Sequence, residues 1–126
     1  MKIELCNKIK IIPVQYVLTQ TAEYIIPLAN RHIMEFTTDG NEFKQESAEQ
    51  NANPYFKQSL ECTVKRITVE QTHLLLNSKV MVILETTKGI KRVWGSREYR
   101  VTCNIEFFPD GAKLKLSCDA VEPVIF

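Results

Sequence analysis

Glycine is scarce in this sequence, with only four residues, at positions 40, 89, 95 and 111. Each stands in a short turn-like stretch, so the chain has no glycine-rich loop whose backbone N–H groups would cradle a phosphate. The signatures G-x-G-x-x-G, G-x-S-x-G and H-E-x-x-H are absent as well. The sequence therefore gives no support for a nucleotide-binding enzyme, a serine hydrolase or a zinc protease.

Histidine and cysteine are few and widely spaced. The two histidines, His32 and His73, lie far apart without a nearby carboxylate motif, and no cysteines form a C-x-x-C pair. In a reducing compartment, isolated cysteines are typical of small buried apolar side chains, and we assign this role to Cys6, Cys62, Cys103 and Cys118. We predict that the protein is not an enzyme and has no catalytic residues, no metal site and no cofactor.

The chain carries almost no excess charge, because sixteen Lys and Arg residues balance fifteen Asp and Glu residues to give a net charge of +1. Residues 88–100 form the one local basic excess, interleaved with Trp94 and Tyr99. This pattern is typical of a solvated hairpin tip with core aromatics, or of a nucleic-acid surface with stacking aromatics. We favour the hairpin tip because Glu85 and Glu98 flank the cluster, and we predict no nucleic-acid partner.

Long hydrophobic runs are missing, and no stretch approaches the roughly 18 apolar residues of a membrane helix. The first residues alternate charged and apolar side chains, unlike a secretory signal. We expect a protein made in the cytosol, with no membrane partner. The length of 126 residues, with 44% hydrophobic and 25% charged residues, predicts a single domain over 1–126.

What the sequence does contain is a central apolar strand preceded by a short helix. Residues 80–84 are five consecutive apolar residues, which predicts a strand covered on both faces in the middle of the main sheet. Before it, Thr68 and Gln71 match a capping box, which predicts a helix over 69–77. We expect this helix to face the sheet with four side chains beside Leu75, namely Val69, Thr72, His73 and Leu76.

Alternation of apolar and polar residues predicts further strands. Residues 2–18 alternate, but Pro13 cannot donate to a sheet, so we expect an edge strand or a break there. Other segments place apolar side chains on one face, namely Leu60, Cys62 and Val64, then Tyr99, Val101, Cys103, Ile105 and Phe107, and finally Leu114, Leu116, Cys118 and Ala120. These patterns predict a mainly β (α+β) fold, an antiparallel β-sandwich or partly open barrel with one short flanking helix around 69–77.

Two registers fit the last predicted hairpin. A two-residue turn at Asp110-Gly111 would set Cys103 opposite Cys118, whereas a loop over 108–111 would set Cys103 opposite Leu116. We favour the loop over 108–111 because Pro109 suits the second position of a type I turn.

Two segments do not fit the strand pattern. Residues 37–54 are almost entirely polar, with Phe43 as the one large apolar residue before Pro54, and form a long polar loop or arm. Three interpretations stay open: a mobile surface loop, a solvated helix over 42–50, or an arm that reaches a neighbouring subunit with Phe43 as its anchor. Residues 121–126 end in Val124-Ile125-Phe126 and must be buried on their own domain or on a partner.

A series of short motifs covers roughly residues 40–100, in the order Phe43-Lys44-Gln45, Tyr55-Phe56-Lys57-Gln58-Ser59-Leu60, Lys65-Arg66, the helix, the strand at 80–84, Thr87-Lys88-Gly89 and Trp94-Gly95-Ser96. This order resembles that of small structural proteins from the tail or head-to-tail module of tailed bacteriophages and prophages. The resemblance implies a β-rich protomer that assembles into a ring or joins a connector, and that is incorporated into a virion.

We therefore predict a non-enzymatic structural or assembly protein that acts through subunit–subunit contacts, with itself or with other virion structural proteins. The alternative is a monomeric β-barrel module that binds a small ligand or peptide. The inward residues predicted above look large enough to fill a barrel, which favours assembly. The predicted interface residues are Phe43, Lys44, Gln45, Tyr55, Val124, Ile125 and Phe126.

Overall fold

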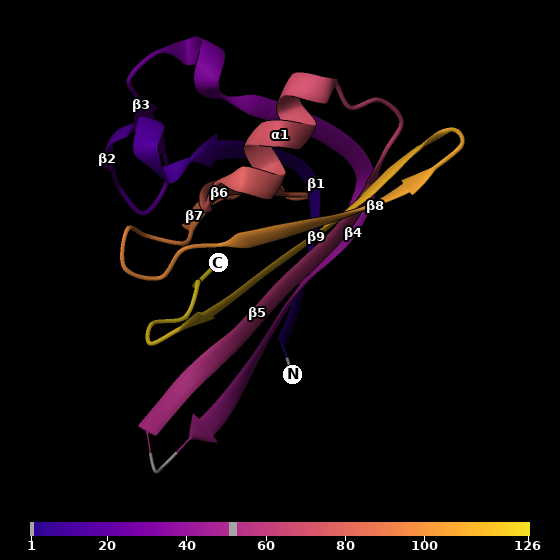
Figure 1. Cartoon of the computed structure of the whole chain (residues 1–126). Coiled ribbons are helices and arrows are strands. Elements are labelled where there is room, and N and C mark those ends of the chain that lie inside the picture. Colours follow the sequence, from indigo (N-terminus) through magenta and orange to yellow (C-terminus); the bar gives the residue numbers. More distant parts are fainter. Residues whose placement is uncertain (1, 51–52) are drawn as a thin grey trace.

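The computed structural model describes residues 2–50 and 53–126, and within them most of the chain is β-strand (Figure 1). Seven of the described strands form one antiparallel sheet in the order β7-β6-β1-β4-β5-β9-β8, and β2 pairs with β3 separately. The elements are β1 (Lys2–Pro13), β2 (Val17–Gln20), β3 (Ile25–Pro27), β4 (Met34–Gln50), β5 (Asn53–Val64), α1 (Val69–Asn77), β6 (Val80–Thr86), β7 (Lys91–Trp94), β8 (Thr102–Phe108) and β9 (Gly111–Ala120), with 3₁₀ turns at Val14–Tyr16 and Asn30–His32.

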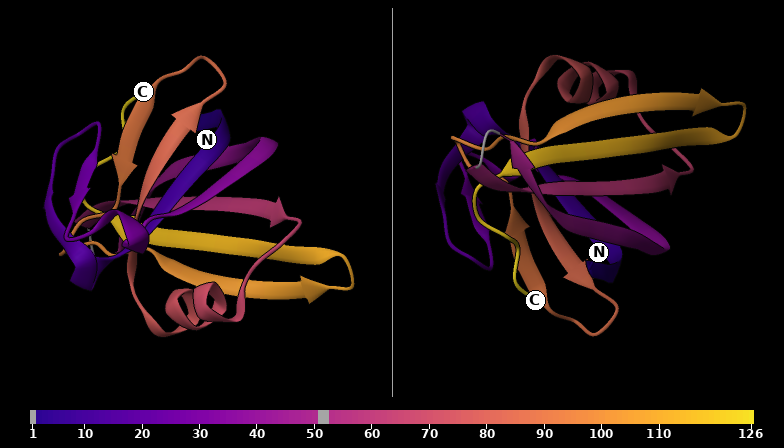
Figure 2. Two further views of the ribbon diagram at one scale, coloured as in Figure 1. Left: turned by 90° about the horizontal axis from the view of Figure 1, so that it is seen from above. Right: turned by 90° about the horizontal axis from the view of Figure 1, so that it is seen from below.

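The large sheet curls around its own inner face and forms a half-barrel (Figure 2). A single bridge joins its two ends, because Val80 at the start of β6 and Val101 just before β8 exchange backbone hydrogen bonds of 2.9 and 3.0 Å. Beyond this bridge β8 diverges from β6, so the barrel stays open. The predicted mainly β fold with a partly open barrel and one short helix is confirmed.

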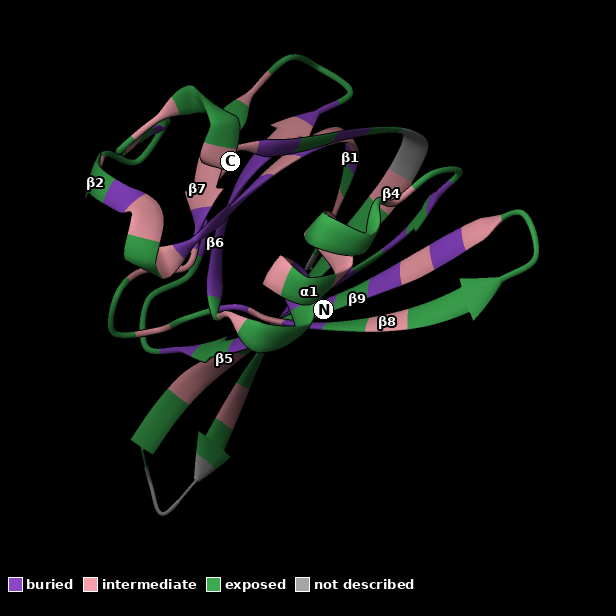
Figure 3. Ribbon diagram, turned by 45° about the horizontal axis from the view of Figure 1, so that its top comes forward, coloured by how far each residue is buried: buried purple, intermediate pink, exposed green. Residues whose placement is uncertain are grey.

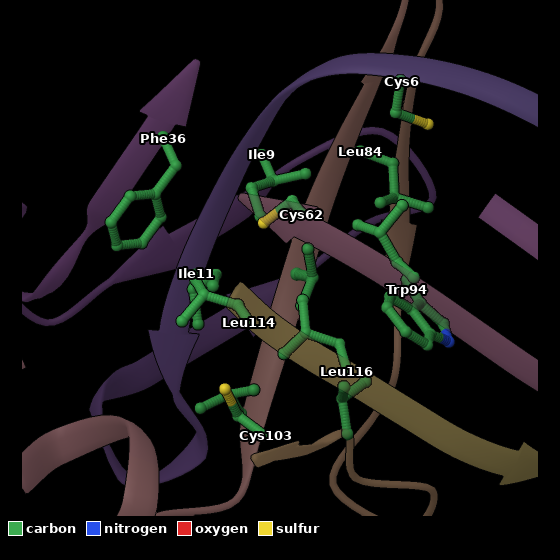
Figure 4. Close-up of a cluster of buried hydrophobic side chains, with 14 of the residues drawn as sticks. Cys6, Ile9, Ile11, Phe36, Cys62, Leu84, Trp94, Cys103, Leu114 and Leu116 are labelled. Atoms are coloured by element: carbon green, nitrogen blue, oxygen red, sulfur yellow. The ribbon is translucent and has the colours of Figure 1, made fainter. Parts of the chain in front are cut away.

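The main core lies inside the curl, where side chains from all seven strands of the large sheet converge (Figure 4). They come from alternate positions of each strand, as expected for a sheet with one face turned inward, and include Ile9, Phe36, Leu60, Leu84, Trp94, Leu114 and Leu116. A smaller second core lies on the opposite face, where β2 and β3 cover β1 and β6, and it contains Ile12, Val17, Ile25, Met81 and Ile83.

Strand β6 is buried on both faces, as its five apolar residues predict. Val80, Val82 and Leu84 face the main core, and the intervening Met81 and Ile83 face the second core. The prediction that this strand lies in the middle of the sheet is wrong, because β6 is next to the edge strand β7 and β4 is central. The small β2–β3 sheet covers the second face of β6, so the strand is buried on both faces although it is not central in the sheet.

Helix α1 begins and ends at the predicted residues. The capping box is formed, since Gln71 N–H donates to Thr68 Oγ1 and Thr68 N–H donates to Gln71 Oε1, each at 3.0 Å. The predicted buried stripe is wrong: Leu75 is fully buried and Leu74 packs beside it, but Val69, His73 and Leu76 are exposed. A helix of this length contacts the core along a single line, so only the side of α1 that carries Leu74 and Leu75 is covered.

The last hairpin has the favoured register, with Cys103 opposite Leu116 and Phe108 opposite Gly111. The inward residues predicted for β9 are all buried. On β8, however, Phe107 is 59% exposed although it occupies the inward face, because this end of the strand extends past the core. Gly111 lies so close to β5 that a Cβ atom on it would collide with the carbonyl oxygen of Val64.

The polar stretch 37–54 is a β-hairpin, except for residues 51–52, which lie outside the described residues. Strand β4 runs to Gln50 and β5 begins at Asn53, with eight residue pairs from Phe43↔Leu60 to Gln50↔Asn53. The interpretations as a structureless loop and as a helix over 42–50 are therefore wrong for the described part. The sequence hid this strand because its outward positions and its protruding end are polar, which leaves little apolar alternation to recognise.

Candidate functional site

Residues 121–126, the terminal segment, form the most specific contact that we find on the half-barrel. The segment leaves β9 after Ala120, bends at residues 121–122 and turns back over the inner face of the sheet (Figure 1). Val124 is buried there, whereas Ile125 remains 68% exposed. The binding site consists of side chains from β4, β5 and β7, which belong to the concave side of the sheet.

Gln45 on β4 holds the backbone of the terminal segment at two points. Its Nε2 donates to the carbonyl oxygen of Val124 at 3.0 Å, and the Val124 N–H donates to its Oε1 at 2.8 Å. The side-chain amide thus satisfies the donor and the acceptor of one residue, as a neighbouring strand would. Gln45 is buried, so these bonds are shielded from competing water.

Gln58 on β5 connects this clamp to the core. It lies directly opposite Gln45, donates from Nε2 to Gln45 Oε1 at 2.7 Å, and accepts from Trp94 Nε1 at 3.0 Å. The described residues contain no buried side-chain nitrogen or oxygen that lacks a hydrogen-bond partner. The two glutamines can therefore be buried without cost from unsatisfied groups, because hydrogen bonds connect Trp94, Gln58, Gln45 and Val124 in series and leave none of their buried side-chain polar atoms without a partner.

An aromatic stack and a cation complete the site. The ring of Phe43 contacts Trp94 and Phe126 edge-to-face, with centroids 5.0 and 5.7 Å apart. Arg92 on β7 donates from Nε to the carbonyl oxygen of Ile125 at 2.8 Å and from Nη1 to the carbonyl of Lys91 at 2.7 Å. Three consecutive residues of the terminal segment, Val124 to Phe126, are thus each recognised by a different side chain.

A cleft of about 540 Å³ continues beside the terminal segment. Its walls come from the start of the β2–β3 turn, from β7 and the turn after it, and from the terminal segment itself, and include Thr21, Ala22, Arg92, Ser96, Tyr99 and Ile125. The exposed side chain of Ile125 lines this cleft, so the terminal segment fills only part of the space at this end of the half-barrel.

The structure brings together five of the seven predicted interface residues, but within one chain. Phe43 and Gln45 meet Val124, Ile125 and Phe126 in the site just described, where Ile125 takes part through its carbonyl oxygen. The prediction that Phe43 anchors an arm on a neighbouring subunit is wrong, because this side chain is 1% exposed and belongs to the core of its own chain. The hydrophobic terminus is covered by its own domain, one of the two possibilities left open.

The other two predicted residues, Lys44 and Tyr55, and the side chain of Ile125 lie outside this site. Lys44 is exposed on the outer face of the sheet, with its Nζ 3.7 Å from a carboxylate oxygen of Glu42. Tyr55 is partly buried near the end of the β4–β5 hairpin. Ile125 belongs to the terminal segment but points into the cleft rather than into the core.

Sequence reasoning missed Gln58, Arg92 and Trp94 as parts of this site. Gln58 carried a usable signal, because it continues the even-numbered inward positions 60, 62 and 64 of the same strand. An inward polar residue at the end of an apolar row indicates a buried hydrogen bond. Arg92 and Trp94 gave no such signal, since their partners are about thirty residues away in the sequence.

The basic cluster at 88–100 is held by hydrogen bonds within the chain. Arg97 Nη2 donates to the carbonyl of Val17 at 2.7 Å, and Arg100 Nε donates to the carbonyl of Arg97 at 2.8 Å. Trp94 is fully buried and Tyr99 packs against the main core. The interpretation of its aromatic residues as core residues is therefore confirmed.

The four cysteines are buried and form no disulfides, as predicted. Burial raises the pKa of the Cys6, Cys62 and Cys103 thiols to about 12 and that of Cys118 to about 11, because a thiolate would lose its hydration. The nearby Cys103 adds to the increase at Cys62, and Asp119 adds to that at Cys118. These thiols are protonated at neutral pH and are poor nucleophiles.

The described ranges 2–50 and 53–126 lack two further features, a metal-binding cluster and a membrane-spanning helix. There, no cluster of three or more His, Cys, Asp and Glu side chains is placed to hold a metal ion. Within the same ranges, no helix has the length and apolar character needed to cross a membrane. In comparisons of the whole chain, no known protein family, curated protein or solved structure matches it.

Proposed function

We propose that this protein is a non-enzymatic structural protein that assembles through subunit–subunit contacts. The observation that carries the proposal is the protruding end of the β4–β5 hairpin (Figure 3). Strand β1 pairs with β4 only as far as Gln45, and β9 pairs with β5 only from Phe56 onward. In the described part of the chain, residues 48–50 and 53–55 therefore pair only with each other.

A two-stranded ribbon of this kind has two open edges. Its outward-pointing N–H and C=O groups lack strand partners, and a strand from another molecule satisfies such groups by extending the sheet. Isolated two-stranded ribbons are only marginally stable in water. We therefore expect the ribbon that extends beyond the core to be stabilised in an assembly, where a strand of a neighbouring molecule pairs with it.

Exposed apolar side chains at another edge support the same function. Phe107 and Phe108 are 59% and 40% exposed at the free end of β8, the outermost strand. Together with the hairpin, they give the molecule two separate surfaces for neighbours, as a ring or a connector requires.

The motif order described above resembles tail and head-to-tail module proteins of tailed phages. We accordingly propose a phage or prophage tail or connector component, with partners that are other copies of this chain or other virion structural proteins.

The hairpin proposal is tested by shortening the ribbon. Replacing residues 48–55 with Asn-Gly joins Ser47 to Phe56 through a two-residue turn and preserves every pair that β4 makes with β1 and β5 makes with β9. In light scattering across a hundredfold concentration range, we expect the unchanged protein to show a mass that rises with concentration or a defined oligomer. The shortened variant should shift toward the monomer.

A matched control replaces exposed residues away from both edges, for which Val69→Ala on α1 is suitable because its side chain is 75% exposed. Urea unfolding of each variant verifies that the fold is intact. A strictly monomeric unchanged protein at every concentration would contradict self-assembly, and an unchanged mass after shortening would remove the hairpin from the interface.

A further inference from the structure

We propose that the site formed by Gln45, Gln58, Arg92 and Phe43 is an exchangeable peptide site, and that in the assembly it binds residues 122–126 of a second copy of this chain. This inference rests on the proposed function, because it describes how assembled copies are joined. The structure already contains one example of the complex, since each chain holds its own terminal segment in this site.

The recognition is directed mainly at the backbone of the terminal segment. Gln45 forms hydrogen bonds with the N–H and C=O of Val124, and Arg92 donates a hydrogen bond to the C=O of Ile125. Phe126 adds a ring contact with Phe43. None of these contacts depends on the segment belonging to the same chain, so a second copy offers this site an identical ligand.

The terminal segment can leave its site without unfolding the half-barrel. Only Val124 is buried outright, while Val121 and Ile125 are 54% and 68% exposed. Pro123 has no N–H that would be left unpaired when the segment is released. Among the described residues, no strand pair involves a position after Ala120, so the sheet is unchanged when the segment leaves.

The effective concentration of the terminal segment determines whether a site binds the segment of its own chain or that of a second copy. A tether of a few residues gives the chain's own segment an effective concentration on the order of millimolar, so a dilute monomer keeps it. Contacts made elsewhere, such as those of the hairpin, hold two copies together and raise the local concentration of the neighbour's segment to a similar level. Exchange is therefore expected in assembled protein and not in dilute protein.

The experiment uses the full-length chain with a photoreactive diazirine amino acid at position 125, where the native side chain already points into the cleft. Unlabelled and ¹⁵N-labelled copies are mixed, concentrated until light scattering shows assembly, irradiated and digested. Crosslinks from position 125 to the peptide containing Arg92 should then join labelled to unlabelled chains in the assembled fraction. The same diazirine at position 69 on α1 measures random encounters.

Two variants connect these crosslinks to the recognition contacts. Gln45→Leu removes the clamp on Val124 and should lose most of the mixed-isotope crosslinks. Lys44→Ala changes the adjacent residue, which is exposed on the outer face, and should keep them. Tryptophan fluorescence shows that both variants remain folded.

The outcomes separate the two proposals. Assembly with crosslinks found only within single chains overturns exchange and leaves the proposed function standing. A monomer at every concentration overturns both. Mixed-isotope crosslinks that survive in Gln45→Leu at the level of Lys44→Ala overturn the assigned clamp.

Discussion

At the scale of single residues, the central feature is a pair of buried glutamines in place of two apolar side chains. A neutral amide offers both donors and acceptors, so Gln58 can accept from the indole of Trp94 while it donates to Gln45. Gln45 in turn holds both backbone groups of Val124. The pair fixes the terminal segment in one register, which apolar contacts alone do not do.

The contribution of these hydrogen bonds to stability can be measured with Gln58→Met, which keeps the approximate side-chain volume but removes the amide. The indole N–H of Trp94 and one bond of Gln45 then lose their partner, and an unpaired buried donor costs about 1–3 kcal/mol. We expect the free energy of unfolding in urea to fall by about 2 kcal/mol. Trp94, the only tryptophan, reports the transition by fluorescence. Lys57→Met, at the exposed neighbouring position, should change stability little, and equal values for both variants would contradict this account.

At the scale of elements, α1 shows what local sequence determines. Its first residue, last residue and cap follow from Thr68, Gln71 and their spacing, because these interactions form within a single turn. Its orientation does not, since Leu75 rather than the predicted stripe is buried. Which side of a short helix is covered depends on where β8 and the sheet lie, and this is set by pairing far along the chain.

The cap gives a test at this scale. Thr68→Ala removes the hydroxyl that accepts from the Gln71 N–H, and the loss of such a cap costs about 1 kcal/mol. Urea unfolding should show this decrease, and circular dichroism should show an otherwise native spectrum. Val69→Ala is the control, because its exposed side chain makes no cap bond. A stability equal to the unchanged protein would mean that the cap is replaced by water at no cost.

At the scale of the whole molecule, four buried thiols link stability to alkaline pH. The folded state raises the thiol pKa from 9.0 to about 12 at Cys6, Cys62 and Cys103. Above pH 9 the unfolded chain therefore releases protons that the folded chain keeps. Because the unfolded state then binds fewer protons, the free energy of unfolding must fall as pH rises from 9 toward 12.

The expected slope is on the order of 1.4 kcal/mol per pH unit for each such thiol once the pH is well above 9. Urea unfolding at pH 7, 9, 10 and 11 measures the slope, and Cys103→Ala removes one thiol from it. The variant should be less stable at pH 7 and should lose stability less steeply above pH 9. Parallel curves for the two proteins would show that this thiol ionises in the folded state as readily as in the unfolded one.

The sequence by itself determined the features that depend on near neighbours. The alternation on β8 and β9 set which faces point inward, Pro109 favoured the register with Cys103 opposite Leu116, and the capping box placed α1. Isolated cysteines were identified as buried apolar residues. Each of these follows from the side-chain period of a strand or helix, or from hydrogen bonds across a few residues.

Only the tertiary structure decided the rest. It placed β6 beside the edge of the sheet, extended the polar stretch into the β4–β5 hairpin, and brought residues 124–126 onto Gln45, Phe43 and Arg92. These features depend on contacts between distant segments, such as Gln45 and Val124, which are 79 positions apart. Local periodicity carries no information on such pairing, because its free energy comes from closing the curled sheet around one shared core.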